Sequence, residues 1–516
     1  MPMMSRCTTV LLVVLSLAAV GCETAPGPID SGGPPCALTS SCQDEAPPEA
    51  VCLEHLAADQ LDDGCGVFVS GPFYGGDDAN PGTKHKPVRS LQRAIAIART
   101  GRGRVFACND AFEGAVVLPS GVDLYGGFHC QEWERTDEDY TTVIIVRQDP
   151  IITLTVEPAG AGDTGAGDGV STIDHVTVRS WIYLGMLVQS GTAVEFIRSE
   201  LRASYGNGGR HGEKWGGLNH APDGAHGMYG GDACSAATVA GGPAVVNPCE
   251  GGIQSLGGKG GDGLADGAGD GTDGDPVPTP NPDHHGQGGI GNRTDGGCGA
   301  GFPGISGAWG AAGAPGEGIG RLTDRGWEGD KAADGSRGMP GQGGGGGGGR
   351  RGGLAVCGVA SKGGAGGGSG GAGGCGGRGG RGGENGRPTI GIAALHAKLT
   401  VRDSLIETLD AGRGGDGGPP EHGGEGGRGA PGGAVGDGTW SCGGGNGGRG
   451  GDGGYGGPGR GGDSIGIAYL DEDQLTLQGV IFELGPPGKG GTSWSHDGSM
   501  ITGEDGMEIE TLRFPE

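Results

Sequence analysis

Apolar and polar residues alternate in three widely separated stretches of the chain, and the three stretches look like copies of one unit. Each copy has an apolar-Gly-apolar triplet and then a second short apolar strand: 184–186 with 194–196, 390–392 with 399–401, and 465–467 with 475–477. Period-two strands in a repeating unit of about twenty residues are typical of a stacked solenoid. We therefore expect the copies to stack in one wound rod, and the glycine-rich tracts between them to leave it as insertions.

An amphipathic helix is expected near the start of this rod. The segment after a strand pattern at 67–70 and a turn-rich loop at 76–83 has its apolar residues at i, i+3, i+4 and i+7: Leu91, Ala94, Ile95 and Ala98. One apolar stripe on a lone helix suits a cap over the open end of a solenoid, since terminal repeats are atypical. Further strands are expected at 143–146, 151–156 and 173–178. The pattern predicts about eight coils, a rod of about 40 Å at about 4.8 Å per stacked strand.

The entry segment resembles a known family. Val67–Ser70, the loop Gly76–Thr83 and Pro87–Ile95 are similar to the opening of pectate-lyase-like right-handed parallel β-helix proteins of bacterial surfaces. The resemblance continues through Val122–Phe128 and ends at residues 133–135. It implies an all-β fold, a right-handed parallel β-helix of the pectin-lyase-like solenoid type with an N-terminal cap helix.

Residues 206–387 and 412–462 are low-complexity glycine-rich tracts. From Gly367 and again from Gly444 the chain repeats Gly-Gly-X. A period of three fits polyproline-II-like helices, which have no internal hydrogen bonds and can satisfy their amides by lying against each other, as polyglycine-II bundles do. A disordered glycine loop is the alternative. The tracts also resemble glycine-rich repeats of mycobacterial surface proteins.

Composition and charge narrow the classes of function. The chain has 516 residues with 130 glycines, 34% hydrophobic and 5% aromatic residues, so only part of it can form a packed core. Its formal net charge is −27. Attraction to nucleic acid or anionic lipid is therefore disfavoured, whereas divalent cations and basic partners fit better.

The first residues predict export. Arg6 precedes an apolar run from Val10 to Val20, and the segment ends in Ala-Val-Gly-Cys22. This ending resembles a bacterial lipobox and implies a signal peptide and lipidation of Cys22, hence a lipoprotein of the outer membrane or cell surface. Without lipidation the protein would be secreted or periplasmic. The expected organisation begins with a signal peptide (1–21), a lipid-anchored tether (22–50) and the cap with the first coils (51–205). A glycine-rich insertion (206–387), one coil (388–411), a second insertion (412–462) and the last coils (463–516) follow.

Twelve of the 14 cysteines remain after Cys7 in the signal and Cys22 are set aside, and disulfides are expected in an oxidising compartment. Six precede residue 131, five lie in the first glycine tract, and Cys442 lies in the second. If the first six pair among themselves, parity requires Cys442 to pair with a cysteine of the first tract. The two tracts would then be linked side by side.

Candidate chemistry is sparse. Five aspartates lie among glycines at a spacing that suits oxygen ligands for calcium, although a solvated acidic loop explains them too: Asp262, Asp266, Asp270, Asp273 and Asp275. The histidines of the tracts suit exposed turns better than a transition-metal site. The acids on predicted strands are scattered in sequence and show no paired polygalacturonase-like motif: Asp123, Asp174, Glu195, Asp403, Glu407 and Glu483.

We therefore expect a non-catalytic envelope protein that displays a rigid face and glycine-rich loops for adhesion or structural contacts. Its partners would be extracellular or envelope glycans or proteins, bound by many weak contacts, and not nucleic acid. The alternative is a polysaccharide lyase or glycoside hydrolase with its site in a groove along the coils, because catalytic carboxylates on adjacent coils can be far apart in sequence. No catalytic residue is assigned, and calcium is the one candidate cofactor.

Overall fold

The computed structural model describes residues 47–515 except 59, 136–140, 148–151, 166–168, 215–219, 293–296 and 437. The predicted signal peptide, the lipidation site Cys22 and nearly all of the predicted tether lie outside the described residues. No helix in the described part is long and apolar enough to cross a bilayer.

The fold is dominated by three parallel sheets, as the all-β prediction requires. Sheet 1 has the order β1 (Val67–Val69), β2 (Arg104–Cys108), β5 (Asp123–Phe128), β8 (Val170–Asp174), β11 (Ala193–Ile197), β20 (Lys398–Arg402) and β23 (Leu475–Gln478). Sheet 2 has the order β27 (Glu508–Arg513), β22 (Ser464–Tyr469), β19 (Thr389–Ala394), β10 (Leu184–Val188), β7 (Leu154–Glu157) and β4 (Val116–Pro119). Sheet 3 has the order β24 (Ile481–Glu483), β21 (Leu405–Thr408), β12 (Glu200–Ala203), β9 (Val176–Ser180), β6 (Thr142–Val146) and β3 (Ala111–Glu113). From β3 to β12 the chain visits sheets 3, 2 and 1 in rotation, and it continues in this way from β19 to β24.

The predicted stacking of the three sequence copies is confirmed. Leu184 on β10 pairs with Ile390 on β19, and Ile390 pairs with Ile465 on β22. All three side chains are fully buried in one apolar cluster. Residues that are about 200 positions apart in sequence are therefore neighbours, because the first glycine tract leaves the sheets after β12 and returns before β19.

A helix packs over one end of the sheets. In α2 (Leu91–Ala98), the four residues of the predicted apolar stripe are all buried, and the Ser90 hydroxyl accepts a hydrogen bond from the Arg93 amide at 3.2 Å. The buried stripe lies against β1, β2 and β4. The expected cap helix is thus present, with a polar cap at its own N-terminus. The remaining helices of the described part are α1 (Glu49–Ala57), α3 (Leu354–Cys357), η1 (Pro72–Tyr74) and η2 (Glu472–Gln474).

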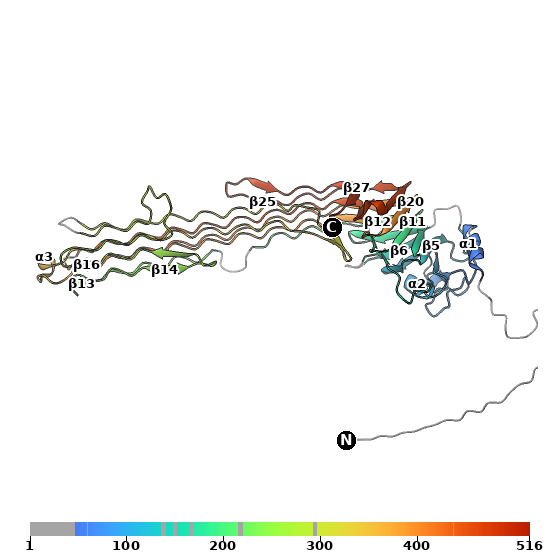
Figure 1. The fold of residues 1–516 in the computed structure, drawn as a ribbon, viewed down its shortest axis with the longest axis horizontal. Helices are drawn as coiled ribbons and strands as arrows, with labels where there is room; N and C mark the ends of the chain where they lie inside the picture. The colour runs from blue at the N-terminus through green and yellow to red at the C-terminus, as the bar shows by residue number, and fades with distance from the viewer. Residues whose placement is uncertain are drawn as a thin grey trace, which may run out of the picture. The chain divides into compact units, whose positions relative to one another are not determined.

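The described parts of both glycine tracts are extended segments that run beside one another (Figure 1). The amides of Gly335, Gly338 and Gly341 donate to the carbonyls of Gly380, Gly377 and Gly374, so the hydrogen bonds recur every third residue. Small antiparallel hairpins decorate the tracts and the C-terminal region: β13 (Thr238–Val239) with β16 (Gly263–Leu264), β14 (Val245–Pro248) with β15 (Gln254–Gly257), β17 (Arg321–Thr323) with β18 (Gly326–Glu328), and β25 (Thr492–Trp494) with β26 (Met500–Thr502).

The run of seven glycines, Gly343–Gly349, lies inside this bundle. Its amides donate to three other segments, at Asp275, Gly371 and Phe302. Its carbonyls accept from three more, through the amides of Gly258, Gly445 and Gly289. The run is therefore surrounded by six neighbouring backbone segments. A Cβ added anywhere in the run would come within 1.7–2.4 Å of a backbone atom. A side chain is therefore excluded at every position, so the usual X of Gly-Gly-X is also glycine here.

The identity of X in the last segment of the first tract follows its burial. Ser369, Ala372 and Cys375 are 0–1% exposed. Farther along the same row, Arg378 is half-buried and Arg381 is exposed. Small residues thus occur where another layer covers the segment, and charged residues occur where that layer ends.

Five disulfides are present in the described residues. Cys298 pairs with Cys442, which confirms the predicted link between the two glycine tracts. Two lie near the N-terminal end, Cys52–Cys65 and Cys108–Cys130, and two lie within the first tract, Cys234–Cys357 and Cys249–Cys375. Cys36 and Cys42 lie outside the described residues.

We expect Gly346→Ala to destabilise the bundle, because its Cβ would lie 1.9 Å from the Lys259 carbonyl oxygen and backbone must move. The expected loss is about 1–3 kcal/mol, the range for overpacking. The matched control is Gly267→Ala, where nothing lies within 4 Å of the added Cβ. Thermal denaturation of both variants checks this, and equal melting temperatures would contradict the packing described above.

Candidate functional site

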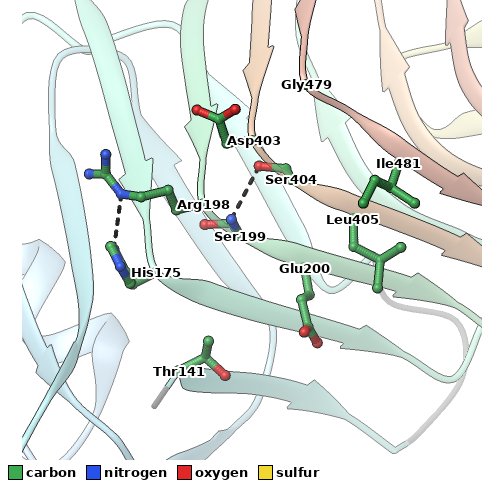
Figure 2. A pocket seen from close by; sticks show the side chains of 10 residues that line it. All are labelled: Thr141, His175, Arg198, Ser199, Glu200, Asp403, Ser404, Leu405, Gly479 and Ile481. Carbon is green, nitrogen blue, oxygen red and sulfur yellow. Dashed lines mark hydrogen bonds between the residues drawn. The ribbon is translucent and has the colours of Figure 1, made fainter. Parts of the chain in front are cut away.

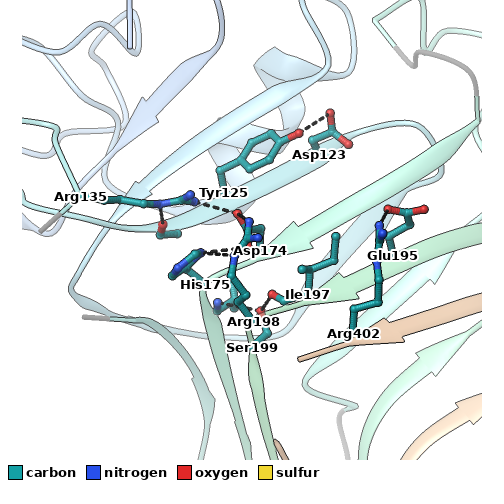
Figure 3. A network of polar contacts seen from close by, with 12 residues as sticks. Asp123, Tyr125, Arg135, Asp174, His175, Glu195, Ile197, Arg198, Ser199 and Arg402 are labelled. Carbon is teal, nitrogen blue, oxygen red and sulfur yellow. Dashed lines mark hydrogen bonds and ion pairs between the residues drawn. The ribbon is translucent and has the colours of Figure 1, made fainter. Parts of the chain in front are cut away.

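A row of charged residues lies on the outer face of sheet 1 (Figure 3). Tyr125 on β5 is paired with Asp174 on β8, and Asp174 with Ile197 on β11. Glu195 lies two residues before Ile197 on the same strand, and Asp123 lies two before Tyr125. The acids Asp123, Asp174 and Glu195 are far apart in sequence, but parallel pairing places them on successive strands of one face, and it also pairs Glu407 on β21 with Glu483 on β24.

Asp174 is the centre of a network of three ion pairs. Its carboxylate lies 3.1 Å from Arg135 Nη2, 2.9 Å from His175 Nδ1 and 2.8 Å from Arg198 Nη2, and its side chain is 3% exposed. Burial alone would raise the pKa of Asp174, but hydrogen bonds from His175 and Arg198 and the charge of Arg135 outweigh it and lower the pKa to about 2. This carboxylate is therefore a fixed anion that holds two arginines and a histidine.

Asp123 has the opposite character on the same face. Its carboxylate accepts a hydrogen bond from the Thr172 amide at 2.8 Å and from the Tyr125 hydroxyl at 3.4 Å, and Arg104 Nε lies 3.9 Å away. Burial dominates and raises the pKa of Asp123 to about 6. The arginine is shared with Glu49, so it compensates only part of the desolvation.

Glu195 completes the row and is paired with Arg402 at 2.5 Å. Each acid on this face thus faces an arginine, and these arginines come from different segments of the chain. Such pairs hold neighbouring strands together, and they leave these carboxylates engaged instead of available as a nucleophile or general base.

A cavity of about 650 Å³ adjoins this face, at the corner between sheets 1 and 3 (Figure 2). Its lining comes from five successive passes of the chain: Thr141, His175, Arg198, Ser199, Glu200, Asp403, Ser404, Leu405, Gly479 and Ile481. His175, Arg198, Asp403 and Gly479 occupy equivalent corner positions and have φ of 55°, 43°, 47° and 64°. The chain therefore makes the same left-handed corner four times, and the side chains at these corners form one wall of the cavity.

Serines lock these corners. The Ser199 hydroxyl accepts from the Val176 amide at 3.0 Å, and the Ser404 hydroxyl accepts from the Ser199 amide at 3.1 Å. Each hydroxyl also donates to a carbonyl two residues earlier at 2.7 Å. The corner is thus a rigid ladder, and its repeat follows the stacking direction of the strands.

The lining of the cavity has groups that can bind a ligand, but few that can act as a general acid or base. Its two carboxylates are Glu200, which lies 3.3 Å from Arg202, and Asp403, whose carboxylate makes no hydrogen bond or ion pair with the described residues. The ring of His175 is engaged with Asp174. Arg198 can donate to a ligand that extends across several turns of the chain, whereas the hydroxyls of Ser199 and Ser404 already donate to backbone carbonyls.

The five aspartates of the calcium prediction do not gather. The Asp262 carboxylate accepts from the Gly241 amide at 2.9 Å, Asp270 from Gly291 at 2.8 Å, and Asp273 from Gly288 at 2.8 Å. Asp275 is joined to Leu256 through its backbone, and Asp266 lies on a separate surface cavity. The described residues hold no cluster of three or more His, Cys, Asp or Glu able to bind a metal. Calcium binding stays a prediction without a gathered ligand set in the described part.

Asp262, Asp270 and Asp273 share a role that was not predicted from the sequence: their carboxylates accept hydrogen bonds from backbone amides of a neighbouring segment. Other polar residues of the bundle have the same role. Side chains at the bundle surface accept hydrogen bonds from amides of a neighbouring segment that has no backbone partner there: Asp223 from Glu425, Asp334 from Gly382, Asp452 from Gly423, Asn446 from Gly429, His211 from Asp416 and His226 from Arg428. The Gly382 amide lowers the pKa of Asp334. The signal in the sequence is the three-residue spacing of acceptor side chains among glycines.

The comparisons with known proteins give no relative from which a function could be transferred. No protein-family model matches the chain. No curated protein and no solved structure matches it. The function is therefore inferred from the geometry of the sheets, the bundle and the cavity.

We expect Asp174→Asn to destabilise the protein by about 3 kcal/mol at pH 7, because it removes the buried negative charge that Arg135 and Arg198 contact. The pKa of Asp174 is lowered from 3.8 to about 2, so the wild-type advantage is complete above about pH 5 and shrinks as the pH falls from about 4 to 2. Urea denaturation across this range measures it. The control Asp403→Asn, at the exposed corner, should change stability by less than about 0.5 kcal/mol.

Asp123→Asn should have the opposite pH dependence. Because the pKa of Asp123 is raised from 3.8 to about 6, its ionisation opposes folding as the pH rises through 6. The variant should match the wild type near pH 4 and be more stable at pH 8, by up to about 3 kcal/mol. The same denaturation series tests this, and a variant less stable than wild type at pH 8 would contradict it.

Proposed function

We propose that this protein is an exported, lipid-anchored envelope protein that displays a rigid scaffold and binds extended glycans or proteins without cleaving them. The scaffold is a right-handed parallel β-helix with polyglycine-II insertions. The observation that carries the proposal is the bundle itself: separate glycine segments hydrogen-bonded at every third residue and cross-linked by disulfides.

The assignment of the scaffold follows from topology and periodicity. Rotation through three parallel sheets is how a β-helix winds, and parallel crossover connections are right-handed in about 98% of cases. A helix with three residues per turn has no internal hydrogen bonds. Polyglycine-II segments must therefore form their hydrogen bonds with neighbouring segments, with a period of three residues.

The envelope location is supported by the cysteines and the N-terminal sequence. Disulfides form and persist in oxidising compartments, and five are present in the described part. The signal-like segment before Cys22 suits export and acylation. The net charge of −27 favours neutral or basic partners over nucleic acid.

A non-catalytic role is favoured by the state of the carboxylates. On the face of sheet 1, Asp174 and Glu195 are held by arginines, and the corner cavity has two carboxylates that lack a paired arrangement with a free histidine. The cavity still crosses several turns of the chain, which favours a polysaccharide-active enzyme as the second candidate.

The two candidates are separated by incubating the purified mature protein with neutral and acidic polysaccharides. If the protein only displays a binding surface, it should bind a polysaccharide without forming new reducing ends or unsaturated products. An enzyme predicts product formation that Glu200→Gln and Asp403→Asn abolish, whereas Glu407→Gln on the same sheet leaves it unchanged. Product formation with this pattern would contradict the display proposal.

A further inference from the structure

Tryptophan is unusually exposed in this protein. The chain has seven tryptophans, and six lie in the described part. Four of these six are at least half exposed: Trp181 (61%), Trp309 (59%), Trp440 (56%) and Trp494 (50%). Tryptophan exposes a large apolar surface, so rigidly held and exposed rings are typical of recognition surfaces.

Among these four, Trp309 is the one built into a ring cluster. Its ring centroid lies 4.7 Å from that of His496 at an interplanar angle of 32°, and Tyr455 lies 6.1 Å from His496. The three rings come from three different segments of the chain. The imidazole thus backs one side of the indole, while more than half of the residue stays open to solvent.

The cluster is held in place by backbone contacts. Gly310, next to Trp309, donates to the Asp452 carbonyl at 2.9 Å and accepts from His496 Nε2 at 3.1 Å. His496 lies in the turn of the β25–β26 hairpin, where Asp497 accepts from the amide and the hydroxyl of Ser499 at 2.9 and 2.6 Å. The indole is therefore pre-ordered, and little conformational entropy remains to be lost on binding.

The surroundings leave room for a ligand on the exposed side. With a period of three, the residues in line with Trp309 are Ser306 and Ala312, both small. The Tyr455 hydroxyl makes no hydrogen bond with the described residues, and Asp497 is exposed beside the cluster. An aromatic face bordered by hydroxyl and carboxylate groups matches a pyranose ring, whose C–H face packs on the electron-rich π surface and whose hydroxyls bind at the rim.

We propose that Trp309, backed by His496 and bordered by Tyr455, is a platform that binds a neutral polysaccharide. A neutral polymer fits because the protein carries a net charge of −27, which repels polyanions. This inference deepens the proposed display function, since it names a ligand class and a site for it on the glycine bundle. The platform is separate from the corner cavity of the sheets.

Native affinity electrophoresis of the full mature protein tests the platform, with gels that contain hydroxyethyl cellulose, galactomannan, dextran or laminarin, and polygalacturonate as the anionic probe. We expect at least one neutral gel to retard the wild type and polygalacturonate not to. Trp309→Ala should weaken that retardation about tenfold or more in dissociation constant, as truncation of a tryptophan anchor does.

Two variants distinguish lost stacking from lost folding. Trp309→Phe keeps an aromatic face and should retain most of the affinity, and Trp181→Ala, an equally exposed tryptophan outside the ring cluster, should bind as the wild type does. Unchanged melting of each variant confirms folding. Equal binding by wild type and Trp309→Ala would overturn the platform alone and leave display intact. Absence of retardation of the wild type in every neutral gel would overturn the platform and the glycan part of the proposed function together.

Discussion

Hydrogen bonding between the backbones of separate segments is the constraint on which this structure depends. An extended glycine segment with three residues per turn has no internal hydrogen bonds, so each buried amide must find its partner on a neighbour. The neighbours must approach so closely that no Cβ fits between them. At Gly346 an added Cβ would lie 1.9 Å from a carbonyl oxygen, and the same holds along the whole run to Gly349. The high glycine content is therefore a packing requirement and does not indicate a flexible linker.

The same constraint explains the polar residues of the bundle. At its surface a segment lacks a neighbour, and its outward amides would be open to pairing with another chain, as at the edge of a sheet. In the segment 411–434, side chains of Asp223, His226 and Asp232 accept the amides of Glu425, Arg428 and Ala434. Pro419 and Pro431 fall in the same three-residue register and carry no amide hydrogen. Part of the acidic character of the chain thus protects the edges of the bundle.

The sheets and the bundle present two different kinds of surface. On the sheets, charged side chains pair with neighbours on the same face, as Asp174 does with Arg135, His175 and Arg198, and the corner residues repeat with the stacking of the strands. In the bundle, backbone amides donate hydrogen bonds to backbone carbonyls of neighbouring segments. Exposed aromatic side chains such as Trp309 are therefore attached to a rigid backbone. The proposed display function draws on both surfaces, because several weak contacts along a rigid direction suit an extended polymer better than a small ligand.

Several features were predictable from local patterns alone. The alternation of apolar residues identified the strands that contain Leu184, Ile390 and Ile465, the i, i+3, i+4 stripe identified the cap helix, and cysteine parity identified the link from Cys442 to the first tract. These are short-range or counting properties, so the order of residues contains them. By contrast, the placing of Asp123, Asp174 and Glu195 on one face, the pairing of each surface acceptor such as Asp334 with its amide, and the meeting of Trp309 with His496 depend on which segments become neighbours. Only the tertiary structure decides that, because hydrogen bonds between segments far apart in the chain select the partners, and the spacing in sequence shows where acceptors lie but not which segment each one meets.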